Sequence, residues 1–220
     1  MSRTDLIRFE LVLFDLDGTL FRSEADIVNA WKETMSCLGL DCPRFASLFR
    51  VGPSLEEMTG TLFPGIDGER KQEIIREFKR RYDSSTFPAT VPYEWAGAML
   101  TALKSAGRKL AVVTNKRQDP TRVLLKKSGW EAQFDGSFSP DILPGTSMTK
   151  PELVRLALTQ FAVPPEHAVM VGDTPGDIAA ARRNRVAAAA VTWGYGSQEE
   201  LKKAEPDLLL TPATWRELLQ

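Results

Sequence analysis

Four aspartates in this chain follow two short apolar runs. Asp15 and Asp17 come directly after the apolar run 11–14, and Asp173 and Asp177 follow a later one. Carboxylates held close together raise one another's pKa values, so a group of four needs a cation to stay ionised. Mg²⁺, a hard cation that takes oxygen ligands, keeps several waters and often shares phosphate oxygens, suits such a site.

A second set of side chains can bind the oxygens of a phosphoryl group. Thr114 and Asn115 end another apolar run, and Lys150 stands directly before Pro151 at the start of a predicted helix. Hydroxyl and backbone donors near helix N-termini hold an oxyanion with little reorganisation, and a lysine adds positive charge. Carboxylates with a metal, facing a hydroxyl and a lysine, are what phosphoryl transfer to an aspartate requires.

The apolar runs predict the sheet that must position these residues. They cover residues 11–14, 110–114, 168–171 and 187–191, with a weaker run at 208–210. The runs are continuous rather than alternating, which is typical of strands buried on both faces. Helical patterns lie between them and end near Gly107 and Gly129. The alternation predicts an α/β fold with a doubly wound, Rossmann-like parallel sheet, whose ligands bind beyond the carboxyl ends of the strands.

The stretch 23–87 contains two amphipathic helical patterns and no convincing buried strand. Their apolar stripes are Ile27, Ala30, Trp31, Met35 and Leu38 in one and Ile74, Ile75, Phe78 and Tyr82 in the other. The stretch starts after the first strand and ends near 88–92, so both connections reach the same end of the sheet, as in a lid. We therefore expect a core of residues 1–20 and 90–220 and an all-helical cap of residues 21–89.

Composition and charge exclude several classes of protein. With 220 residues, 43% hydrophobic and 26% charged, the chain is neither collagenous nor disordered. A net charge of −1 gives no basic surplus for a nucleic-acid polymer or an anionic membrane. Two cysteines and one histidine provide neither a disulfide framework nor a zinc site. An N-terminus without an apolar signal core, and no long apolar run, predict a cytoplasmic protein. Nothing in the sequence indicates the oligomeric state.

Four ordered motifs resemble those of the haloacid dehalogenase-like hydrolase superfamily. They occupy residues 14–20 (Phe-Asp-Leu-Asp-Gly-Thr-Leu), 113–116, 150–151 and 171–177. The resemblance extends over nearly the whole predicted core, and the helical insert resembles the cap of the phosphoglycolate phosphatase-like and phosphoglucomutase-like branches. It implies an enzyme, a phosphoric monoester hydrolase.

The resemblance also implies a role for each motif residue. Asp15 would be the nucleophile that becomes an aspartyl phosphate, and Asp17 would be the general acid and then the general base. Thr114, the amide of Asn115, and Lys150 would hold the transferring phosphoryl group.

The metal site is implied in the same way. Asp173 would bind Mg²⁺ together with the Asp15 carboxylate and the Asp17 backbone carbonyl, and Asp177 would support the metal and its waters. Gly18 would let the backbone turn sharply between these groups.

Two positions depart from the motifs of the superfamily, and one arginine of the predicted cap is a further candidate site residue. Arg22 takes a place near the expected hinge where the superfamily often has an acidic residue, and Thr149 precedes Lys150 where many members have glycine. Arg50, next to a Gly-Pro loop of the cap, is either a surface arginine or a contact to a second anionic group of the substrate.

Several reactions are compatible with these motifs. A phosphatase acting on a small phosphorylated metabolite is favoured, and residues 114–116 and 51–53 are similar to phosphoglycolate phosphatase-like enzymes. Nucleotidase, pyrophosphatase and sugar phosphatase activities remain open. A phosphomutase of the β-phosphoglucomutase type usually has a serine-rich run at 114–116. A dehalogenase would need neither a metal nor Asp17, and a signalling receiver domain would lack the insert after the first strand.

Overall fold

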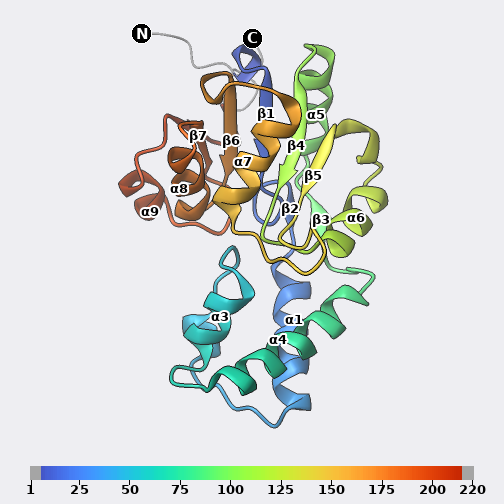
Figure 1. The fold of residues 1–220 in the computed structure, drawn as a ribbon, viewed down its shortest axis with the longest axis vertical. Helices are drawn as coiled ribbons and strands as arrows, with labels where there is room; N and C mark the ends of the chain where they lie inside the picture. The colour runs from blue at the N-terminus through green and yellow to red at the C-terminus, as the bar shows by residue number, and fades with distance from the viewer. Residues whose placement is uncertain (1–5, 215–220) are drawn as a thin grey trace.

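The central element of the computed structural model, which describes residues 6–214, is a parallel sheet of six strands (Figure 1). Its strands are β1 (Leu11–Phe14), β4 (Lys109–Val113), β5 (Gly136–Phe138), β6 (Ala168–Gly172), β7 (Ala187–Val191) and β8 (Leu208–Leu210). They lie in the order β5-β4-β1-β6-β7-β8. The order runs outward in both directions from β1, so the crevice of a doubly wound sheet lies beyond the carboxyl ends of β1, β4 and β6.

The strands of the six-stranded sheet match the predicted runs to within one residue at each end, and one strand was not predicted. The run expected at 110–114 forms a strand one residue earlier, which leaves Thr114 just beyond the end of β4. The edge strand β5 was not predicted, because its three residues Gly-Ser-Phe contain neither an apolar run nor an alternating pattern. The predicted doubly wound α/β fold is confirmed.

Helices cover both faces of this sheet. One face packs against α5 (Ala96–Ser105) and α6 (Gln118–Lys127), and the other against α7 (Lys150–Phe161), α8 (Pro175–Arg183) and α9 (Gln198–Lys203). Short 3-10 helices lie at Leu6–Arg8, Glu131–Gln133 and Pro165–His167. Side chains of the central strand β1 pack against the helices on both faces of the sheet. Val12 and Phe14 pack on the α5 side, and Leu11 and Leu13 pack on the α7 side. Burial on both faces explains why these runs are continuously apolar.

Four helices between the first strand and residue 83 form a second lobe below the sheet in Figure 1. They are α1 (Glu24–Cys37), α2 (Phe45–Leu48), α3 (Leu55–Leu62) and α4 (Gly68–Asp83). The apolar stripes of α1 and α4 face each other, and the ring centroids of Trp31 and Phe78 lie 4.7 Å apart. We call residues 24–83 the helical insert.

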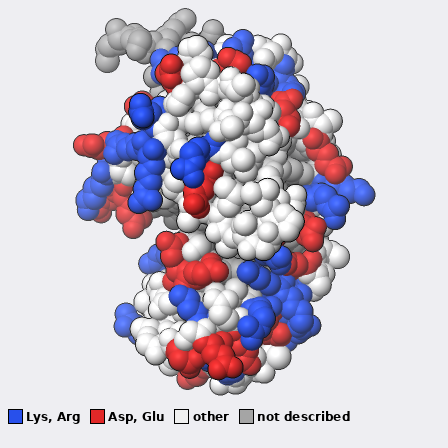
Figure 2. Space-filling model, viewed as in Figure 1, with Lys and Arg blue, Asp and Glu red and all other residues white. Residues whose placement is uncertain are grey.

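Both connections to the insert pass through a two-stranded antiparallel ribbon of β2 (Phe21–Arg22) and β3 (Val91–Pro92). The ribbon ties the beginning and the end of the insert together at the base of the lobe, as a hinge requires. In Figure 2, acidic and basic side chains are interspersed around the insert. Among residues 6–214, no helix has the length and apolar character needed to cross a membrane.

Candidate active site

The sequence-predicted site residues converge at the carboxyl ends of the central strands. Asp15 and Asp17 follow β1, Thr114 and Asn115 follow β4, and all four line one cavity of about 80 Å³ beneath the insert. Asp173 follows β6, Lys150 begins α7, and Asp177 lies in the first turn of α8. Residues as far apart in the sequence as Asp15 and Asp177 are thus brought together by strand order.

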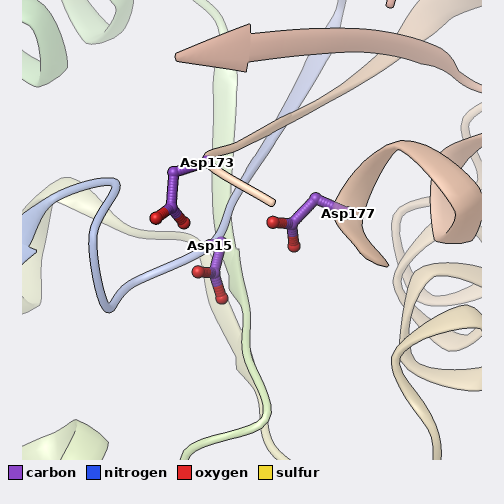
Figure 3. Close-up of side chains that lie close together, drawn as sticks. All are labelled: Asp15, Asp173 and Asp177. Atoms are coloured by element: carbon purple, nitrogen blue, oxygen red, sulfur yellow. The ribbon is translucent and has the colours of Figure 1, made fainter. Parts of the chain in front are cut away.

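Three aspartates form a compact buried cluster (Figure 3). One carboxylate oxygen from each of Asp15, Asp173 and Asp177 lies within 4.8 Å of the others. The ammonium of Lys150 donates hydrogen bonds to Oδ1 of Asp15 at 2.8 Å and to Oδ1 of Asp177 at 2.6 Å. One lysine cannot neutralise three buried carboxylates, so the fully ionised cluster needs a further positive charge.

The pKa values reflect this imbalance. Burial raises the pKa of Asp15 to about 7, although the charge of Lys150 opposes the shift. Burial, with the charges of Asp15 and Asp177, raises the pKa of Asp173 well above its usual range. Burial alone would lower the pKa of Lys150, but the two adjacent carboxylates outweigh it and raise that pKa. The lysine therefore stays charged, and the oxygen donor set fits a hard divalent cation.

The loop after β1 approaches the cluster closely at Gly18. This residue has a φ of +84°, and a Cβ atom at this position would lie 2.1 Å from Oδ2 of Asp173. The backbone amide of Tyr195 donates a hydrogen bond to the same Oδ2 at 2.7 Å, and Thr19 donates to Oδ1 at 3.3 Å. Glycine is needed here both for its backbone conformation and for the space that Asp173 occupies.

Two helix N-termini carry charged residues into the site. Thr149 begins α7 in a reciprocal capping box with Glu152, and Lys150 follows at the first position of the helix. Thr174 begins α8 in the same way, with Asp177 as its partner: Oδ2 of Asp177 accepts hydrogen bonds from the amide and hydroxyl of Thr174 at 3.0 and 2.7 Å. Asp177 therefore caps a helix with one oxygen and contacts Lys150 with the other.

The side chains of Thr114 and Asn115 each make one hydrogen bond to protein, and each residue keeps a donor for a ligand. Thr114 Oγ1 accepts the amide of Lys116 at 3.1 Å, which leaves its own hydroxyl hydrogen to donate elsewhere. The side chain of Asn115 donates to the carbonyl of Gly52 in the insert at 2.8 Å. Its backbone amide has no acceptor within residues 6–214. Both donors suit an oxyanion bound at this strand end.

Asp17 is paired with a lysine that the sequence analysis did not single out. The Lys116 ammonium lies 3.0 Å from Oδ1 of Asp17, and the lysine side chain is 2% exposed. Lys116 belongs to the 113–116 motif, but a lysine after a strand end more often extends into solvent, and no local signal shows that this one turns inward.

The comparisons with known proteins agree with this geometry. The model of the family described as "Haloacid dehalogenase-like hydrolase" matches residues 12–191. The chain belongs to this family. The resemblance seen in its four motifs is thereby confirmed, and the chain is an enzyme of the hydrolase class.

Three relatives of this haloacid dehalogenase-like hydrolase carry different names. "Tyrosine-protein kinase PtkA" of Mycobacterium tuberculosis is 31% identical over 95% of this chain and 71% of that protein. "Pyrophosphatase PpaX" of Bacillus velezensis is 33% identical over 92% of each chain. "Phosphoglycolate phosphatase" of Aquifex aeolicus is 32% identical over 91% of this chain and 92% of that protein.

A solved structure shows the same architecture over most of the chain. The crystal structure of a predicted phosphatase from Clostridium acetobutylicum superposes with a TM-score of 0.85 at 27% identity, covering 96% of this chain and 98% of that one. The hydrolase is thus a phosphatase of the phosphoglycolate phosphatase type, with an acidic cluster able to bind a metal.

The two arginines that the sequence analysis singled out, Arg50 and Arg22, differ in their position relative to the cavity. Arg50 lines the cavity, but its guanidinium donates to the carbonyls of Ser47 at 3.0 Å and Phe49 at 2.7 Å. Arg22 lies over the ring of Tyr93, 5.4 Å from its centroid, and is not among the residues lining the cavity. Arg22 therefore belongs to the ribbon that joins the two lobes.

The raised pKa values predict how pH acts on the metal-free hydrolase. Asp15 and Asp173 bind protons more tightly in the folded than in the unfolded chain. The contribution of these two groups to the free energy of unfolding therefore falls as pH rises from about 4 toward 7. Mg²⁺ requires the ionised carboxylates, so its stabilising effect should grow over the same range. Thermal unfolding at pH 5, 6.5 and 8, in EDTA and in Mg²⁺, measures both trends.

Asp173→Asn is the control, because it removes a buried titrating group with little change in the shape of the side chain. The difference in unfolding temperature between wild type and this variant in EDTA should fall from pH 5 to pH 8. A difference that rises with pH, or a Mg²⁺ effect larger at pH 5 than at pH 8, would contradict the assignment.

Proposed function

We propose that this protein is a Mg²⁺-dependent phosphatase that hydrolyses a small phosphorylated metabolite through an aspartyl phosphate on Asp15. The observation that carries the proposal is the placement of the Asp15 carboxylate. It lies in one cavity with Asp17, Thr114 and Asn115, and it is hydrogen-bonded to Lys150 at 2.8 Å. A nucleophile, a proton donor and a set of oxyanion donors thus surround one small space.

In the first step a carboxylate oxygen of Asp15 attacks phosphorus as the bond from phosphorus to the leaving oxygen breaks. Asp17 gives its proton to that oxygen, so the product leaves as an alcohol. Lys150, the Thr114 hydroxyl and the Asn115 amide hold the phosphoryl oxygens during the transfer. In the second step Asp17 takes a proton from water, which attacks the same phosphorus and releases phosphate from Asp15.

The acidic cluster fits a metal, and we assign it to Mg²⁺. Asp15 and Asp173 would hold the ion with the backbone carbonyl of Asp17, and Asp177 would support its waters. When bound, Mg²⁺ would offset the repulsion between the anionic phosphoryl group and the attacking carboxylate. Lys150 alone leaves this repulsion partly uncompensated, because it already contacts both Asp15 and Asp177.

We assign residues 1–20 and 90–220 to the catalytic core and residues 21–89 to a cap that excludes water. Apolar side chains of the insert line the cavity opposite the aspartates: Ile27, Trp31, Phe49, Val51, Leu55, Met58 and Phe78. A dry wall over the reacting group strengthens each charge interaction inside and keeps water from competing with the nucleophile. Water then enters for the second step when the cap opens.

The cavity beside Asp15 has room for a phosphoryl group. Its volume is about 80 Å³, and a wider cavity of about 740 Å³ that contains Lys150 shares Gly52 and Asn115 with it, so the organic part of a small metabolite has room next to the phosphoryl group. 2-Phosphoglycolate heads our list, and the named activities of the three relatives share phosphoryl transfer while differing in substrate. The net charge of −1 supports metabolites, rather than a nucleic-acid polymer or a membrane, as partners in the cytoplasm.

The test is phosphate release from 2-phosphoglycolate, nucleotide monophosphates, sugar phosphates and pyrophosphate, with Mg²⁺ and with EDTA. We expect release with at least one compound, and we expect EDTA to abolish it. Asp119→Asn, a substitution on the surface of α6, should leave the rate unchanged. A folded, Mg²⁺-binding protein that releases no phosphate from any compound would overturn the proposal, and isomerisation of a sugar phosphate would replace it with a phosphomutase.

A further inference from the structure

Lys116 is a buried lysine that the proposed mechanism does not use. Its ammonium forms a hydrogen bond with the hydroxyl of Tyr82, and it lies 4.5 Å from the centroid of that ring and 5.7 Å from the centroid of Phe87. Asp17, 3.0 Å away, is its acidic partner among residues 6–214. A buried ammonium is stable only when it is paired and hydrogen-bonded, so these contacts account for its position.

The two buried lysines divide the acidic residues between them. Lys150 contacts Asp15 and Asp177, whereas Lys116 contacts Asp17. Asp15 and Asp17 are two residues apart in the chain, yet each carboxylate has its own cation. This division separates the group that carries the phosphoryl from the group that moves protons.

The ion pair also distinguishes the two oxygens of Asp17. Oδ1 is buried and lies 3.0 Å from the Lys116 ammonium, and apart from this ion pair neither oxygen accepts a hydrogen bond from residues 6–214. The Asp17 side chain retains 13% exposure and lines the cavity. Lys116 therefore holds one oxygen and leaves the other for the leaving group and the attacking water.

Lys116 stands at the middle of a contact between the two lobes. Its neighbours in the β4–α6 loop also bond to the insert: Asn115 donates to the Gly52 carbonyl at 2.8 Å, and Arg117 pairs with Asp83 at the end of α4. Lys116 bonds to Tyr82 of the same helix. Of these three consecutive residues, Lys116 is the one whose side chain contacts both the insert and a carboxylate of the site.

We propose that Lys116 is a positioning residue that holds the Asp17 carboxyl for proton transfer, and that Tyr82 makes this arrangement depend on the insert lying over the core. The Lys116 ammonium has a further N–H donor besides the one directed at Asp17. The Tyr82 oxygen accepts a hydrogen bond from this donor when the two lobes are together. The catalytic proton donor is then fixed only in the closed enzyme. The inference rests on the proposed phosphatase function.

The experiment compares two phosphate esters that differ in their need for a proton. An alkyl ester such as 2-phosphoglycolate releases a poor leaving group that Asp17 must protonate, whereas 4-nitrophenyl phosphate releases a stable phenolate. The ratio kcat/KM is measured, because it covers the steps up to the aspartyl phosphate and excludes its hydrolysis. We expect Lys116→Met to lower kcat/KM for the alkyl ester by a factor on the order of 10², and for the nitrophenyl ester by less than about tenfold.

Matched variants separate positioning from a loss of structure. Lys116→Arg keeps the charge and should recover part of the loss, while Lys126→Met, on exposed α6 surface, should change neither ester. Tyr82→Phe keeps the ring but removes the hydroxyl, and should show the same preference for the nitrophenyl ester at a smaller magnitude. In an Asp17→Asn background, Lys116→Met should cause no further loss, because its effect passes through that carboxyl.

Each alternative result has a distinct meaning. An equal fall in kcat/KM for both esters would assign Lys116 a purely structural role and overturn the inference. Unchanged rates, or an additive loss on top of Asp17→Asn, would do the same. The alkyl ester used is one that the wild-type enzyme hydrolyses in the substrate panel above. A folded wild-type enzyme that releases phosphate from no compound of that panel would instead overturn the proposed function, and the inference with it.

Discussion

Asp15→Asn is expected to lower phosphate release by a factor on the order of 10⁴ or more. The amide has nearly the shape of the carboxylate but cannot form the aspartyl phosphate, so the reaction loses its covalent step. Burial already disfavours the ionised form of Asp15, whose pKa lies at about 7. Removing this charge therefore relieves repulsion in the cluster, and the metal-free variant should unfold at the same temperature as the wild type or higher.

Two measurements check this result together. Steady-state phosphate release gives the rate, and thermal unfolding in EDTA shows that the fold is retained. Asp119→Asn, which replaces an exposed aspartate that is 73% accessible, is the matched control for the same chemical change. A rate near that of the wild type in a folded Asp15→Asn variant would exclude Asp15 as the nucleophile.

Lys150→Ala is expected to lower the rate by a factor on the order of 10² to 10³, because the transferring phosphoryl group loses a preorganised positive charge. Its second effect is on folding. Asp15 and Asp177 lose their shared buried partner, and breaking a buried pair in this way costs about 3–5 kcal/mol of stability. Protonation of the carboxylates offsets part of that loss, so destabilisation should be larger at pH 8 than at pH 6.

Activity, unfolding temperature and the two pH values are measured in the same buffer series. Lys150→Met, which keeps the length and apolar stem of the side chain, separates the loss of charge from the loss of packing. Lys109→Ala is the control, since Lys109 is 42% exposed and pairs with Glu10 at the surface. Unchanged turnover in a folded Lys150 variant would mean that another cation binds the phosphoryl group.

Much of the fold was predictable because its signals are local. Strands buried on both faces must be continuously apolar, so the runs at 11–14, 168–171 and 187–191 mark β1, β6 and β7 to within one residue. The edge strand β5 is different. It has three residues and depends on pairing with β4, so nothing within Gly136–Phe138 itself specifies a strand.

The convergence of the aspartates was also predictable, since residues that follow parallel strands meet at one edge of the sheet. The departure at Thr149 has a local explanation in the structure: threonine caps α7 in a reciprocal pair with Glu152. Arg50, by contrast, turns part of its guanidinium to carbonyls of its own loop, a choice that its sequence context does not reveal.

The sequence by itself determined the sheet, the order of the motifs and the residue types that stand at the strand ends. Only the tertiary structure decided which cation meets which carboxylate. Lys150 reaches Asp15 across 135 positions of the chain, and Lys116 turns to Asp17 and Tyr82 instead of solvent. A lysine stem is long and flexible, so its partner is set by the elements packed around it, and those elements are far apart in the sequence.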